Sequence, residues 1–172
     1  MKIKKINKLD YNKKTNFMPK PKIFLGTDHA GFELKEEIKN YLQKEGYEVE
    51  DQGAFSYDEK DDYPEFIFKA AKKVSENKGS KGIIFGGSGQ GEAIVANKVP
   101  GIRAAVYYGN KEIITLSRIH NDANILSIGA RFISKKEAIE AVKSWLSTSF
   151  SNEERHKRRI GQISKIEENL CK

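Results

Sequence analysis

The sequence predicts an α/β fold, a single doubly wound, Rossmann-like domain in which helices cover both faces of a five-stranded parallel sheet. Two observations predict it. Five short apolar runs alternate along the chain with segments of helical periodicity. The chain has 172 residues, enough to bury one core, and its single cysteine, Cys171, excludes an intrachain disulfide.

Each expected element follows from its apolar pattern and its boundary residues. Residues 22–25 form a strand that ends at Gly26, and an apolar stripe from Phe32 to Leu42 predicts a helix that stops near Gly46. The remaining expected elements are, in order, a strand at 47–49, a helix from Pro64 to Val74, a strand at 82–85, a helix at 92–98, a strand at 103–108, a helix at 111–119, a strand at 124–128, and helices at 138–146 and 160–170.

Ligands of doubly wound sheets bind beyond the carboxyl ends of the strands. In this sequence those ends are followed by the loops at 26–31 and 86–91 and by the turns near Tyr108 and Gly129. Chemistry-bearing side chains in these segments are therefore candidate site residues.

The formal net charge of +7 is concentrated at the amino terminus. Residues 1–20 hold seven lysines and one aspartate, whereas residues 21–172 carry a net charge of only +1. This basic segment predicts a disordered extension before a domain at 21–172. It lacks the arginines of a mitochondrial presequence and the apolar core of a secretory signal, and Met18 offers a later start. We therefore expect a soluble cytoplasmic protein without a nucleic-acid or membrane partner.

The segment "GGSGQGE", residues 86–92, follows the third expected strand. Its spacing is neither G-x-G-x-x-G nor the G-x-x-x-x-G-K-[ST] of a P-loop, so a dinucleotide or nucleoside triphosphate site is not predicted. Locally, a tight turn can require glycine for positive φ. Four glycines together with Ser88 favour a nest of backbone amides that faces negative charge.

Glu92 follows this loop directly. An acid in the first turn of a helix is favourable on electrostatic grounds alone. A carboxylate beside a crevice of amide donors also suits removal of a proton next to a carbonyl, because the amides stabilise the oxyanion that forms. The residue alone leaves both interpretations open.

Two polar pairs contain histidine. Asp28 and His29 stand between the first strand and the first helix, where Asp28 either caps the helix or points with His29 into the crevice. His120 and Asn121 follow the helix expected at 111–119, where a histidine can simply interact with the helix dipole.

Three arginines suit a phosphate. Arg131 comes just after the last strand, and Arg155 and Arg159 are spaced i, i+4 on one helical face. A solvated basic face is the common alternative for the last two. No metal-ligand spacing occurs, so we expect no metal.

Together these segments resemble the sugar-phosphate isomerase family of ribose-5-phosphate isomerase B, which also includes galactose-6-phosphate and allose-6-phosphate isomerases. The resemblance covers about residues 21–165. It rests on "GTDHAGFELK", "DDYP", "GGSGQGEAIVANKVPGIRAA", "SRIHNDAN", "GAR" and "RHKRRI", in family order. It implies interconversion of an aldose phosphate and a ketose phosphate through an enediolate, without a metal or other cofactor. Ribose 5-phosphate and ribulose 5-phosphate, in pentose phosphate metabolism, are the leading expectation.

The resemblance also implies roles. Glu92 is the proton-abstracting base, His120 with Asn121 opens the sugar ring, and Asp28 contacts the sugar hydroxyls. The enediolate lies on a catalytic Ser88 hydroxyl and on the loop formed by Gly87, Ser88, Gly89, Gln90 and Gly91. The phosphate lies among His29, Arg131, Arg155 and Arg159. The family is dimeric, so a homodimer with shared active sites is implied, and a tetramer stays open.

Many members of this family carry a cysteine base just before the glycine loop, where this chain has Gly86. A second branch uses a glutamate directly after the loop, and this sequence matches that branch through Glu92. A carboxylate is ionised at pH 7 without the pKa lowering that a thiol needs.

Two other functions stay open from the sequence. A 6-phosphohexose such as allose or galactose 6-phosphate would undergo the same chemistry, with a longer distance between the base and the phosphate groups. A non-catalytic module that binds a phosphosugar or a nucleotide would use the glycine loop without turnover.

Overall fold

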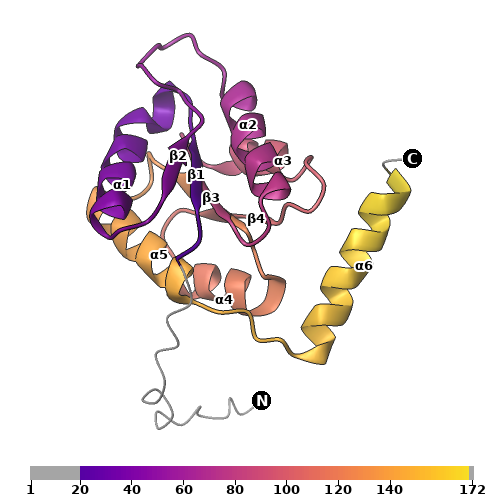
Figure 1. The fold of residues 1–172 in the computed structure, drawn as a ribbon. Helices are drawn as coiled ribbons and strands as arrows, with labels where there is room; N and C mark the ends of the chain where they lie inside the picture. Colours follow the sequence, from indigo (N-terminus) through magenta and orange to yellow (C-terminus); the bar gives the residue numbers. More distant parts are fainter. Residues whose placement is uncertain (1–19, 171–172) are drawn as a thin grey trace, which may run out of the picture.

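The computed structural model describes residues 20–170, so all but the last residue of the expected basic extension lies outside the described residues. Figure 1 shows one sheet between two layers of helices. All strand pairs are parallel, in the order β2-β1-β3-β5-β4. The strands are β1 (Ile23–Gly26), β2 (Val49–Asp51), β3 (Lys81–Gly86), β4 (Ala104–Tyr107) and β5 (Ile125–Gly129). The predicted α/β fold is confirmed.

Helices follow the strands in alternation. They are η1 (His29–Gly31), α1 (Phe32–Lys44), α2 (Tyr63–Glu76), α3 (Gln90–Ala96), α4 (Lys111–Asn121), α5 (Lys135–Ser147) and α6 (Glu154–Leu170). Side chains of α1, α4 and α5 pack on one face of the sheet, and those of α2 and α3 on the other. No helix within residues 20–170 is long and apolar enough to cross a membrane.

The central strand β3 explains why the sheet needs cover on both faces. Ile83 and Phe85 belong to the apolar cluster with α1 and α5, whereas Ile84 belongs to the cluster with α2. Successive side chains of a strand point to opposite faces, so a continuous apolar run is stable only where both faces are buried. The two clusters together form the core.

Three predicted elements have ends that are wrong by about two residues, and α5 and α6 begin three and six residues before their expected starts. β2 lies at Val49–Asp51 instead of 47–49, because it is an edge strand in which Glu50 and Asp51 can face solvent or ionic partners. α3 begins at Gln90 instead of Glu92. α4 continues through Asn121, and Asp122 closes it in a left-handed conformation with φ of 44°. His120 therefore lies inside the last turn of α4 and does not follow the helix.

The last helix, α6, projects to one side of the sheet in Figure 1 and contacts the body at few points, among them the Gly101 N–H, which donates to Glu167 Oε2 at 3.1 Å. His156 is its only buried residue within the described range, and Ile163 and Ile166 are 42% and 60% exposed. An amphipathic helix with an exposed apolar side lacks its packing partner in this single chain.

Candidate active site

The carboxyl ends of β1, β3 and β5 meet at one edge of the sheet, as their parallel pairing requires. The glycine loop is fastened to the end of β5 there. Ala130 N–H donates to the Gly86 carbonyl at 2.8 Å, and Ser127 Oγ–H donates to the Gly89 carbonyl at 2.6 Å. Gly89 has a φ of 77°, the positive value for which a tight turn needs glycine. These two hydrogen bonds fix the loop to the end of β5.

Glu92 lies in the first turn of α3 and is only 5% exposed. Its carboxylate fills the space next to Gly86, because a Cβ on Gly86 would lie 1.7 Å from Glu92 Oε1. A side chain at position 86 would therefore displace the Glu92 carboxylate from this position. Burial, and to a smaller extent the charge of Asp28, raises the pKa of Glu92. A partly desolvated carboxylate of this kind is a stronger base than an exposed one.

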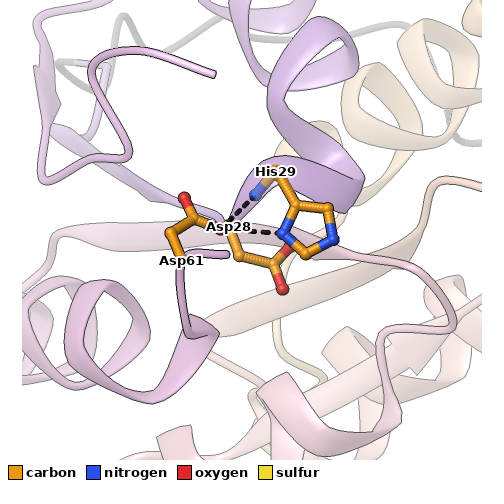
Figure 2. A group of neighbouring side chains, drawn as sticks. All are labelled: Asp28, His29 and Asp61. Carbon is orange, nitrogen blue, oxygen red and sulfur yellow. Dashed lines mark hydrogen bonds and ion pairs between the residues drawn. The ribbon is translucent and has the colours of Figure 1, made fainter. Parts of the chain in front are cut away.

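Asp28 and His29 follow β1, and Figure 2 shows them beside Asp61. Asp28 is buried and its Oδ1 accepts the Ala30 N–H at 2.9 Å, so the expected cap is present, on η1. Asp61 Oδ1 lies 2.8 Å from both the backbone nitrogen and Nδ1 of His29. The hydrogen bond to Asp61 raises the pKa of His29. Asp61 was not among the predicted site residues, although it lies in the segment "DDYP".

These three residues are also the one group within residues 20–170 whose histidine and carboxylate ligand atoms lie within 4.8 Å of one another. Asp61 and His29 already bind each other, and Asp28 already caps η1. A metal would compete with both hydrogen bonds. The expectation that no metal is used stays a prediction.

Arg131 and Tyr63 border the glycine loop from two sides. The Arg131 guanidinium lies 3.3 Å from the point that a Cβ on Gly87 would occupy, and the Tyr63 hydroxyl lies 2.7 Å from the same point on Gly91. Tyr63 was missed from the sequence, because nothing in "DDYP" assigns its hydroxyl a neighbour. At this edge the structure thus brings together Asp28, His29, the glycine loop with Ser88, Glu92 and Arg131.

His120 and Asn121 lie at the opposite edge of the sheet. α4 runs antiparallel to the strands, and the side chain of Arg103, next to the start of β4, donates to the Asn121 carbonyl at 2.9 Å. A strand of five residues separates the two edges by roughly 15 Å. A single chain therefore does not bring His120 next to Glu92.

The start of α6 joins this second group. Ser151 N–H donates to the Ile119 carbonyl at 3.1 Å, and the buried His156 imidazole lies on that of His120 with ring centres 4.5 Å apart. Burial, followed by the charge of Arg155, lowers the pKa of His156. Arg155 and Arg159 are exposed on the same helix. One imidazole, one amide and two guanidinium groups are thus presented away from the glycine loop of their own chain.

Comparison with known proteins decides the family, because the sequence matches the ribose/galactose isomerase family over residues 23–163. The chain belongs to the ribose/galactose isomerase family. A ribose-5-phosphate isomerase B from Mycolicibacterium paratuberculosis is 44% identical over 146 residues, which cover 85% of this chain and 91% of that protein.

Solved structures of ribose/galactose isomerases agree. Ribose-5-phosphate isomerase B from Clostridium thermocellum is 45% identical, with a TM-score of 0.82 over 87% of this chain and 99% of that one. The enzyme from Mycoplasma genitalium, solved with bound ribulose 5-phosphate, is 37% identical, with a TM-score of 0.82 over 86% and 96% of the two chains. The expected resemblance is confirmed, and this family member is an aldose-ketose isomerase.

Proposed function

We propose that this protein interconverts ribose 5-phosphate and ribulose 5-phosphate through an enediolate, without a metal or other cofactor. The observation that carries the proposal is the buried Glu92 carboxylate, which lies beside the glycine loop at the end of β3. The names of the relatives support the substrate, since ribose-5-phosphate isomerase B recurs among them and one structure holds ribulose 5-phosphate. The single cysteine needs no oxidising compartment, and we place the enzyme in the cytoplasm.

The chemistry follows from the carboxyl edge of the sheet. Glu92 takes the C2 proton of the aldose, and negative charge develops on O1. Amides of the glycine loop and the Ser88 hydroxyl stabilise this charge, and Asp28 orients the sugar hydroxyls. A hydroxyl proton moves from O2 to O1, and the Glu92 carboxylic acid returns its proton to C1 as O2 becomes the ketone oxygen.

A second copy of the chain completes the proposed site. The partner's His120 and Asn121 open the sugar ring, and the partner's Arg155 and Arg159 join His29 and Arg131 around the phosphate. Such sharing would bring together the two groups that lie apart within one chain.

The uncovered edge of the sheet at β4 also supports a dimer with shared sites. Exposed apolar residues flank that edge, namely Ile94, Ile113 and Leu116. An exposed edge strand with apolar neighbours is a common surface for pairing between copies.

The purified protein should be assayed with ribose 5-phosphate, allose 6-phosphate and galactose 6-phosphate, with and without a chelator. We expect kcat/KM for ribose 5-phosphate to exceed the other two by at least about tenfold, the discrimination that one extra carbon allows. The chelator should have no effect. Preference for a 6-phosphohexose would contradict the substrate, and loss of activity on chelation would contradict the metal-free mechanism.

A further inference from the structure

Asp61 is mostly buried where the chain enters α2. Its side chain is 11% exposed, and Oδ1 lies 2.8 Å from two nitrogens of His29. Its other oxygen, Oδ2, is buried, and no hydrogen-bond partner for it occurs among residues 20–170. A buried carboxylate with an unpaired oxygen costs free energy unless a cation faces it. Asp61 therefore needs a positive charge nearby.

His29 is the group that can supply this charge. In the described part of the chain, Asp61 forms no ion pair with a lysine or an arginine, and His29 is its one partner. The ring of Tyr57 packs edge-on against the same imidazole, with centres 6.3 Å apart. Asp61 and Tyr57 thus fix the plane of the imidazole, and the negative charge of Asp61 favours its protonated form.

We propose that Asp61 is a positioning residue that holds the His29 imidazole doubly protonated, with Nδ1–H on Asp61 and Nε2–H directed at the substrate phosphate. The inference rests on the proposed function, in which His29 belongs to the phosphate end of the site. Figure 2 shows the second ring nitrogen on the side of the imidazole that faces away from Asp61. A carboxylate on one ring nitrogen sets the orientation and proton state of the other, so Asp61 acts through His29 without touching substrate.

The arrangement predicts a pH range for phosphate binding. The hydrogen bond to Asp61 is the largest cause of the raised His29 pKa, burial opposes it, and the charge of Asp28 adds to it. Because this pKa is raised, the imidazolium is present below it and is lost as the pH rises through it. A phosphate monoester becomes mainly a dianion above about pH 6. Binding should therefore be tightest between about pH 6 and the His29 pKa.

The substitution Asp61→Asn tests this inference, because it keeps an oxygen that accepts both N–H groups and removes only the charge. The chain has three histidines, so an NMR titration follows each imidazole, and His29→Gln assigns the His29 signal. In Asp61→Asn we expect His29 to titrate at lower pH. At pH 7.5, binding of inorganic phosphate should weaken about tenfold and KM for ribose 5-phosphate should rise by a similar factor, while kcat stays within about threefold.

Asp58→Asn is the matched control, since Asp58 belongs to the same segment and is exposed, and its side chain accepts only the Lys60 N–H, at 3.0 Å. It should behave like the wild type, and thermal melting checks that both variants fold. An unchanged His29 titration or unchanged phosphate affinity in folded Asp61→Asn would overturn the inference. Stoichiometric binding of Zn²⁺ alone at the His29 imidazole would also overturn it. Titration and phosphate binding need no turnover, so they separate this inference from the proposed isomerase activity.

Discussion

Glu92 combines two properties that oppose each other, since it is buried and it must be ionised to act as a base. Burial raises its pKa, so its ionised form destabilises the folded chain as the pH rises through that pKa. The absence of a side chain at Gly86 leaves the space that this carboxylate occupies. Such a strained electrostatic position is typical of a catalytic group.

We predict that Glu92→Gln lowers kcat at least about a hundredfold, the contribution of a general base. The same variant should melt at a higher temperature at pH 7, because the neutral amide has no ionic desolvation cost. Steady-state kinetics and thermal melting measure the two effects. Glu33→Gln is the control, since Glu33 also lies in a helix first turn but is exposed, and it should change neither. Wild-type turnover in Glu92→Gln would contradict the assignment of the base.

Local patterns in the sequence predict which neighbours some residues of the candidate site have, and do not predict them for others. Glu92 and the glycine loop are adjacent in the sequence, so their proximity could be predicted from residues 86–92 alone. Asp61 and His29 are 32 positions apart, and no local pattern marks that pair. No local pattern marks the proximity of the Tyr63 hydroxyl to the loop either, because it arises only when α2 packs on α3.

At the scale of elements, buried contacts of one lysine join α1 to the last residue of β2 and to the segment that follows β2. Lys35 is fully buried, and its Nζ donates to Asp51 Oδ2 at 2.7 Å and to the Ala54 carbonyl at 2.5 Å. Lys39 Nζ also lies 2.8 Å from Asp51 Oδ2, but its side chain is 28% exposed. The segment that these contacts fasten leads on to Tyr57 and Asp61.

We predict that Lys35→Met lowers the free energy of unfolding by about 3 kcal/mol, because it removes the fully buried one of the two cations on Asp51 and the side-chain donor of the Ala54 carbonyl. Lys39→Met should cost about 1 kcal/mol or less, since a partly exposed ion pair contributes little. Urea unfolding of both variants measures the difference. Equal losses would show that Lys35 has no special role in fastening this segment.

The predicted elements were right in kind and order because apolar periodicity is a local property of the chain. Their ends were less predictable. The strand expected at 47–49 followed the apolar residues, whereas the hydrogen-bonded ladder with β1 runs along Val49–Asp51. α3 begins two residues early because Gly89, at φ of 77°, makes the turn before it. These ends depend on backbone hydrogen bonds that residue type alone does not specify.

For the whole molecule, the decisive feature is the division of the candidate residues between two edges of one sheet. Motif order along the chain does not reveal it, because His120 is only a few residues before β5 in sequence. The reversal of direction in α4 places it at the amino edge. The carboxyl edge of one copy and the amino edge of another are therefore the two halves of the proposed active site.

Complementation tests this claim most directly. Glu92→Gln and His120→Ala are each expected to be inactive with ribose 5-phosphate, and their subunits are then exchanged by partial unfolding and refolding of a mixture. Random pairing makes half of the dimers hybrid, each with one intact site, so about a quarter of wild-type activity should return. A mixture of Glu92→Gln with Arg131→Ala, both at the carboxyl edge, should stay inactive. No recovery in the first mixture, with both variants folded and dimeric, would contradict the shared site.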